Sequence, residues 1–141
     1  MKELQDEYNF LKKHFGTMVP NQVFFQDPEG NVVAICAPVI IKSDIFDEHN
    51  RPYILQIMQE NPELQSQVEF FIQKYKRLAN EGQIVDLFGN ENLVISEDNK
   101  LHYVDSFIIF AKHPVVIASS NERIGHLESL LRESRAEKSK I

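Results

Sequence analysis

Apolar residues recur every three or four positions in four stretches of the chain, and this spacing predicts amphipathic helices. The predicted helices cover residues 2–15, 52–60, 63–81 and a C-terminal stretch that begins at Ser119. Ser119 and Glu122 stand at capping-box spacing, which favours a helix start at that point. The alternating charges at the C-terminal end predict that this last helix frays into a solvated tail.

Short apolar runs joined by turn residues predict two β-hairpins. Residues 22–26 and 31–36 flank the turn Asp27-Pro28-Glu29-Gly30, in which proline fixes φ early and glycine permits a positive φ late. The second hairpin joins two apolar runs through a polar turn: residues 93–95, 97–100 and 101–104.

The remaining segments complete a predicted α+β fold, because the strands are grouped apart from the helices. Residues 42–52 are polar and predict a connecting loop or a single helical turn, whereas residues 107–110 and 115–118 predict apolar strands beside the second hairpin. The predicted order is helix, β-hairpin, two helices, β-hairpin and C-terminal helix. The 141 residues suit one domain with one core.

The stretch from Gly82 to Phe107 carries the candidate chemistry. Asn92 precedes the first strand of the second hairpin and Asp105 follows the second strand, so the hairpin would bring both to the same end. Asp86, a few residues earlier, would lie beside them. Two carboxylates and an amide oxygen are suitable ligands for a hard divalent cation. The alternative is that each residue serves an ordinary turn, as aspartate and asparagine often do.

This order of residues resembles the catalytic core of the protein-kinase-like fold, especially the bacterial small-molecule phosphotransferases. The resemblance implies that Asp86 is the catalytic aspartate and that Asn92 and Asp105 bind Mg²⁺. It also implies a hinge at residues 37–39, where Ala37 and Val39 would meet the adenine ring of ATP. A strand end broken by proline is the alternative interpretation of that segment.

The chain departs from the family pattern in several places. Ile84 and Val85 stand where the family has histidine and arginine, and the spacing from Asp86 to Asn92 is one residue longer than usual. Asn90 offers a second, shorter register. No glycine-rich loop or strand lysine precedes the first helix, so little or no phosphotransferase activity is expected.

The resemblance implies one reduced kinase-like domain in three parts. Residues 1–41 would be a small-lobe remnant made of a helix and a hairpin. Residues 42–118 would form the core of the large lobe with its catalytic-loop-like hairpin, and residues 119–141 the C-terminal helix and tail. In the first helix, Glu3 or Glu7 would occupy the place of the glutamate that normally pairs with the strand lysine.

Composition narrows the expected partners and location. A formal net charge of −6 disfavours binding to nucleic acid or to an anionic membrane. The longest apolar run, residues 32–41, is too short to span a bilayer. The single Cys36 lies in that run, which predicts a buried structural thiol and fits a reducing, cytoplasmic location.

Two classes of function remain open from the sequence. The first is a reduced kinase-like domain with weak ATP and Mg²⁺ binding. The second is a small acidic interaction or regulatory protein, of the adaptor, antitoxin or immunity type, without a nucleotide site. In either class an incomplete lobe would expose apolar surface, so a homodimer or a complex with another protein is expected.

Overall fold

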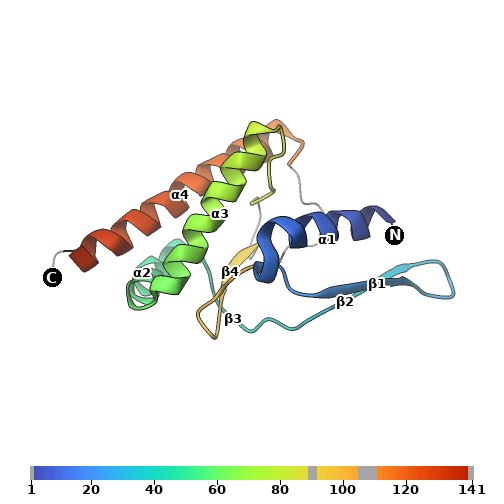
Figure 1. The fold of residues 1–141 in the computed structure, drawn as a ribbon, viewed down its shortest axis with the longest axis horizontal. Helices are drawn as coiled ribbons and strands as arrows, with labels where there is room; N and C mark the ends of the chain where they lie inside the picture. Colours follow the sequence, from blue (N-terminus) through green and yellow to red (C-terminus); the bar gives the residue numbers. More distant parts are fainter. Residues whose placement is uncertain (1, 89–91, 105–110, 140–141) are drawn as a thin grey trace.

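The computed structural model describes residues 2–88, 92–104 and 111–139, and in that part of the chain the protein is an α+β fold with two small antiparallel sheets (Figure 1). The α+β prediction is therefore confirmed. In chain order the elements, with η for a 3₁₀ helix, are α1 (Lys2–Phe15), η1 (Gly16–Met18), β1 (Gln22–Gln26), β2 (Val32–Cys36), β3 (Ile41–Asp44), η2 (Glu48–Asn50), α2 (Arg51–Glu60), α3 (Pro62–Asn80), β4 (Leu93–Ser96), β5 (Leu101–Tyr103) and α4 (Pro114–Ser139).

The first hairpin forms as its turn residues predict. One carboxylate oxygen of Asp27 accepts hydrogen bonds from the backbone N–H groups of Glu29, at 3.0 Å, and Asn31, at 2.8 Å. Gly30 has φ of 86°, a value that glycine adopts without steric cost. The result is the separate two-stranded sheet β1–β2, which projects from the body of the molecule (Figure 1).

The second sheet has the order β3–β4–β5, and β3 was not predicted. Ile41 pairs with Ser96 and Asp44 pairs with Val94, so the expectation of a loop or helical turn is wrong for residues 42–44. The sequence Ile-Lys-Ser-Asp has little β-propensity of its own. Pairing with β4, far along the chain, fixes this strand.

Helix α3 ends close to the predicted point, and Gly82 follows it with φ of 84°. The N–H of Gln83 donates to the carbonyl oxygen of Leu78 at 2.9 Å, and that of Gly82 donates to Ala79 at 3.0 Å. These bonds satisfy two of the last carbonyl groups of the helix. The chain then turns toward the segment that contains Asp86.

Helix α4 corrects two predictions about the C-terminal region. It begins at Pro114 rather than Ser119, so residues 115–118 are helical and not a strand. Proline suits the first turn of a helix, and packing outweighs the strand preference of the β-branched residues that follow. The helix also continues to Ser139, where a fraying tail was expected.

The C-terminal part of α4 forms ion pairs with both neighbouring helices. Glu133 accepts from Arg51 of α2 at 2.7 Å, and Arg135 donates to Glu69 of α3 at 2.9 Å. In Figure 1, α4 runs beside α3 over much of its length. Two of the charged residues that predicted a solvated tail therefore form ion pairs with α2 and α3.

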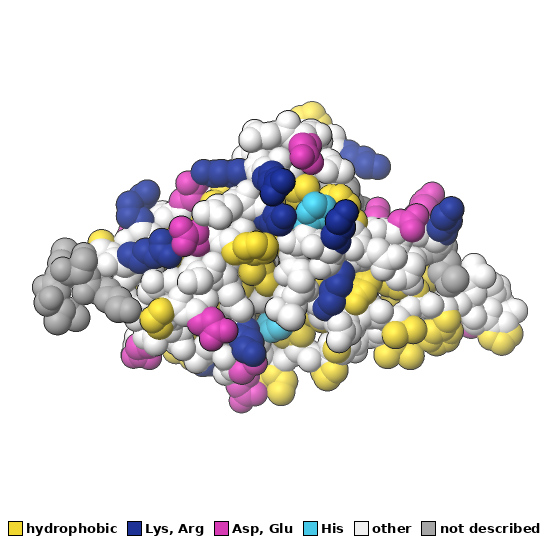
Figure 2. Space-filling model, in the orientation of Figure 1, with side chains coloured by type: hydrophobic (Ala, Val, Ile, Leu, Met, Phe, Trp, Pro, Cys, Tyr) yellow, Lys and Arg dark blue, Asp and Glu magenta, His cyan; other side chains and the backbone are white. Residues whose placement is uncertain are grey.

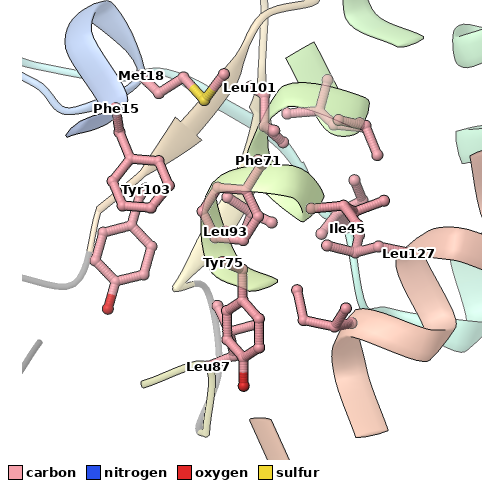
Figure 3. Close-up of a cluster of buried hydrophobic side chains, with 14 of the residues drawn as sticks. Phe15, Met18, Ile45, Phe71, Tyr75, Leu87, Leu93, Leu101, Tyr103 and Leu127 are labelled. Carbon is pink, nitrogen blue, oxygen red and sulfur yellow. The ribbon is translucent and has the colours of Figure 1, made fainter. Parts of the chain in front are cut away.

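The core lies where α1, α3, α4 and the β3–β4–β5 sheet meet (Figure 3). The ring of Phe71 on α3 lies 5.1 Å from Phe15 and 6.4 Å from Tyr103, measured between ring centroids. Leu93 on β4 and Leu127 on α4 are fully buried in the same cluster. This packing fixes β4 and β5, which carry the candidate site at one end.

Cys36 is exposed, so the prediction of a buried thiol is wrong. It is the last residue of β2, in a sheet that is only two strands wide. The apolar run around Cys36 indicates a strand, but an apolar run does not show whether that strand lies in the core.

Candidate functional site

The segment that contains Asp86 is fixed to helix α4 through the backbone of Leu87. The N–H of Leu87 donates to the hydroxyl of Ser120 at 2.9 Å, and its carbonyl oxygen accepts from Arg123 at 2.6 Å. Leu87 itself is fully buried. Since both backbone polar groups of a buried residue are paired, this point of the segment is held firmly.

Asp86 is half-buried and stands immediately before this anchor. Its Oδ1 accepts the backbone N–H of Phe88 at 2.8 Å, the geometry of a local aspartate turn. Its backbone carbonyl accepts the phenol O–H of Tyr103 at 2.8 Å, which ties the segment to β5. An ionised carboxylate offers about four acceptor positions, so one such bond leaves capacity for a ligand.

Asn92 binds the carbonyl group of Phe88. Its side chain is buried, and Nδ2 donates to the carbonyl oxygen of Phe88 at 2.7 Å. The N–H of Val104 donates to the backbone carbonyl of Asn92 at 2.9 Å, so the two ends of the β4–β5 hairpin meet here. Asp86 and Asn92 are thus linked through the two backbone groups of Phe88: the carboxylate accepts from its N–H and the carboxamide donates to its carbonyl oxygen.

The third predicted ligand, Asp105, lies outside the described residues, as does the alternative Asn90. The described chain contains no group of three or more His, Cys, Asp or Glu side chains placed to hold a metal ion. The fit to Mg²⁺ therefore rests on a carboxylate and a carboxamide that share one loop. Both are oxygen donors of the kind that Mg²⁺ accepts together with water and phosphate.

The charge of Asp86 contributes to a raised pKa of Tyr75 on α3. Burial and, after it, the negative charge of Asp86 raise the pKa of Tyr75 to about 12. Its hydroxyl donates to Oδ1 of Asn121 on α4 at 2.8 Å. The phenol is therefore a neutral hydrogen-bond donor near the loop, and it is not an acid–base group at neutral pH.

The two predicted cofactor-binding residues lie between β2 and β3 and are placed differently. Ala37 is exposed, and its N–H donates to the carbonyl oxygen of Asn21 at 2.7 Å. This bond belongs to the base of the first hairpin, so the N–H of Ala37 is already paired with a backbone acceptor. Val39 is half-buried and is the better placed of the two to contact a ligand.

Val39 lines a surface cavity of about 530 Å³. Ile40 lies beside it, and Glu97, Asp98 and His102 of the β4–β5 hairpin line the other wall. Burial lowers the pKa of His102, which favours its neutral form. The cavity thus combines an apolar wall with carboxylates and an imidazole, a lining that suits an uncharged ring with polar substituents better than a phosphate group.

The glutamates of α1 have no strand lysine as a partner in the described chain. Glu3 is exposed, whereas Glu7 is half-buried. Burial raises the pKa of the Glu7 carboxyl, and the nearby Lys112 acts in the opposite direction. Lys112 follows the second hairpin, so this contact differs from the helix–strand ion pair that the family resemblance implies.

Sequence reasoning missed the residues that hold the loop, namely Ser120 and Arg123. Ser120 lies in the stretch where the sequence predicts a helix start, and its hydroxyl bonds a backbone group 33 positions away. The guanidinium of Arg123 also lies 4.7 Å from the ring centroid of Phe46, which orients it toward the loop from the helix. Since these partners are distant in sequence, no local spacing could have identified them.

Comparison of the chain with protein-family models, with curated proteins and with solved structures finds no match. None of the described helices is both long enough and apolar enough to cross a membrane. The kinase-like interpretation therefore depends on the residues of this chain alone.

Proposed function

We propose that this chain is a reduced kinase-like domain that binds a magnesium–nucleotide complex weakly and transfers phosphate poorly or not at all. The observation that carries the proposal is the convergence of Asp86 and Asn92 on the backbone of Phe88, at one end of the β4–β5 hairpin. The cavity beside Val39 lies at the other end of the same hairpin.

The four buried residues of β4, roughly 13 Å long at about 3.3 Å per residue, separate the cavity from the end of the hairpin at Asn92. A base against Val39 and Ile40 would leave its phosphates near Asp86 and Asn92. The carboxylates at the cavity end would repel phosphates, which favours this orientation over the reverse one.

Mg²⁺ bound to these oxygen donors would neutralise phosphate charge. Asp86, Asn92 and Asp105 would hold the ion together with phosphate oxygens and water. In a phosphotransferase the residue at the place of Asp86 orients an acceptor hydroxyl, and that role would fall to Asp86 here.

Poor turnover is expected because Arg123, a cation that the described structure places near the loop, is already engaged with other protein groups. Arg123 is a cation close to the loop, yet it donates to the carbonyl of Leu87 and lies over Phe46. Removing one strong electrostatic group from such a site costs about 3–4 kcal/mol of transition-state stabilisation. Binding without efficient transfer would make the domain a nucleotide-dependent partner for another protein.

A thermal-shift titration tests the proposal. ATP with Mg²⁺ should raise the melting temperature of the wild type, since a ligand that binds only the folded state stabilises it. ATP without a divalent cation should give a smaller shift. The shift should disappear in Asp105→Ala and in Asp86→Ala. Asp6→Ala removes the same charge from an exposed position on α1 and should leave the shift unchanged.

An unchanged melting temperature at millimolar MgATP would refute the nucleotide site. A shift that persists in both Asp86→Ala and Asp105→Ala would place any binding elsewhere in the molecule.

A second function, that of an interaction or regulatory protein without a nucleotide site, is favoured by a different observation. The bonds from Asp86 and Asn92 to Phe88 close the loop without any ligand. In addition, the β1–β2 hairpin exposes large apolar side chains, including Val23 at 64% and Ile35 at 59%. No response to nucleotide, combined with recovery of a stable protein complex, would select this alternative.

A further inference from the structure

Helices α1 and α3 border a groove on the surface of the molecule. Residues 13–18, at the end of α1 and in η1, form one wall of a hollow of about 410 Å³, and the outer side of α3 from Glu63 to Phe70 forms the other. A second hollow of about 240 Å³ extends along α3 as far as Arg77, and Phe70 lines both. We call the two hollows together the α1–α3 groove.

Phe70 gives the groove an apolar centre. Its side chain is 42% exposed, although it is a large aromatic residue. Phe70, Lys74 and Arg77 are spaced by four and three residues, so they lie on one side of α3. The ammonium nitrogen of Lys74 lies 6.0 Å from the ring centroid of Phe70. An apolar ring and two cations are thus presented together.

Cations from both helices surround His14 in this groove. Burial and then the charges of Lys74, Lys13 and Arg77 lower the pKa of His14, whereas the charge of Glu81 opposes them. Figure 2 shows Lys and Arg side chains gathered around a histidine and apolar side chains in the centre of this view. Lys13, Lys74 and Arg77 form no ion pair with any described residue.

This concentration of positive charge contrasts with the formal net charge of −6 of the whole chain. Three cations around one imidazole repel one another, and an anionic ligand would relieve that repulsion. The groove therefore offers charge complementarity to an acidic partner, and the hollows beside Phe70 offer room for an apolar side chain.

The short extent of the positive surface selects the kind of acidic partner. Glu63 lines one end of the groove, and Glu81 lies near His14 toward the other. The stretch of α3 from Phe70 to Arg77 is roughly 10 Å long at about 1.5 Å per residue. A nucleic acid strand or an anionic membrane would extend beyond it over an acidic protein surface, whereas a few carboxylates of a protein segment fit within it.

We infer that the α1–α3 groove binds a short acidic segment of another protein, in which one apolar side chain stands among carboxylates. The apolar side chain would contact Phe70, and the carboxylates would face Lys13, Lys74 and Arg77. Charge would speed association and select the partner, while the apolar contact would supply affinity. The groove shares no residue with the proposed nucleotide site, so this inference does not rest on that site.

Fluorescence anisotropy with a labelled peptide tests the charge of the groove. The probe carries one leucine between two pairs of glutamates. The wild type should bind it saturably, and raising NaCl from about 50 mM to about 500 mM should weaken binding. The double variant Lys74→Gln and Arg77→Gln should bind at least about tenfold more weakly.

Lys76→Gln provides the matched control. Lys76 is on the same helix, but its ion pair with Glu128 at 2.9 Å places it on the side of α3 that faces α4. This variant loses one of the same cations outside the groove and should keep the dissociation constant within about twofold of the wild type. Lys74→Gln and Arg77→Gln change charges without ion pairs, so the melting temperature should stay at the wild-type value.

A second peptide, with serine in place of leucine, tests the apolar contact. It should bind the wild type at least about fivefold more weakly than the leucine peptide, and this difference should vanish in Phe70→Ala. Binding of the leucine peptide should also raise the pKa of His14, measured by NMR titration, because a nearby negative charge favours the protonated imidazole.

Failure of the leucine peptide to bind at millimolar concentration would overturn the inference, as would full binding by the double glutamine variant or an unchanged pKa of His14. Tighter binding of single-stranded RNA or of phosphatidylserine vesicles to the same cations would overturn it too. Asp86→Ala should bind the peptide like the wild type. Loss of nucleotide binding and loss of peptide binding are therefore distinguishable.

Discussion

One substitution separates the hydrogen bond that Asn92 donates from its proposed role as a metal ligand. Asn92→Asp keeps an oxygen that could bind a metal ion and removes the N–H that donates to Phe88. Because the side chain is buried, this change should lower the free energy of unfolding by about 1–3 kcal/mol in urea denaturation. If the oxygen is also a ligand, millimolar Mg²⁺ should restore part of the loss.

Asn9→Asp makes the same chemical change at an exposed position on α1 and should alter stability by less than about 0.5 kcal/mol. An equally mild effect at both positions would show that the bond to Phe88 does not hold the loop.

The lowered pKa values of three histidines predict how the free energy of unfolding changes with pH. Burial is the main cause that lowers the pKa of His14, His102 and His126 below the ordinary value of 6.5. The unfolded chain therefore binds protons more readily than the folded one at these sites. Their contribution to stability is complete above pH 6.5 and is lost as the pH falls through and below that value.

The corresponding measurement compares the free energy of unfolding at pH 7.5 and pH 5.5 for the wild type and His102→Gln. The variant should lose less stability than the wild type over this interval, because one of the three histidines no longer takes up a proton. An identical loss in both proteins would mean that His102 does not contribute to the pH dependence.

At the residue scale, sequence reasoning succeeded where the cause was local. Gly30 adopts the positive φ that its place in the turn predicts, and Gly82 follows α3 with φ of 84°. Asp86 and Asn92 each bond a backbone group of Phe88, a link that only the structure reveals. Asp105 lies outside the described residues and stays a prediction.

At the scale of elements, the contact between α4 and the loop at Leu87 gives a sharp prediction. Ser120→Ala leaves the buried N–H of Leu87 without its acceptor and should cost about 1–3 kcal/mol of unfolding free energy. Ser119→Ala, one position earlier, does not remove this acceptor and should cost less than about 0.5 kcal/mol. Equal effects would show that the anchor is unimportant for stability.

Helix α4 should be held by apolar packing more than by its ion pairs. Leu127 is fully buried, so Leu127→Ala should cost about 2–5 kcal/mol. Arg135→Ala should cost less than about 1 kcal/mol, because both partners in its ion pair with Glu69 are 44% exposed. Chemical denaturation of both variants tests which substitution costs more stability. A larger cost for Arg135→Ala would show that the ion pair holds α4 more strongly than apolar packing does.

The elements that sequence predicted well are those with their own periodic pattern, such as α1 and α3. Strand β3 lacked such a pattern and depends on pairing with a strand about fifty residues later. The first turn of α4 carried β-branched residues that indicated a strand, but a proline start and tertiary packing made it helical. Local propensity could not have settled either case.

At the scale of the whole molecule, the expectation of exposed apolar surface is confirmed on the β1–β2 hairpin, where Val23 and Ile35 are more than half exposed. The sequence could not locate it, because an apolar run does not show whether its strand lies in the core. The exposed apolar side chains lie on β1–β2, whereas the proposed nucleotide site involves β4–β5.

The most direct test of the account uses Mn²⁺ in place of Mg²⁺. Adding Mn²⁺ with ATP to isotopically labelled protein should broaden the NMR signals of residues around Asp86, Asn92 and Asp105 first, because the paramagnetic ion acts over short distances. ATP alone should shift signals beside Val39. Broadening that is absent at millimolar ligand, or that spreads over acidic surfaces such as the Asp27 turn, would contradict the proposed nucleotide site.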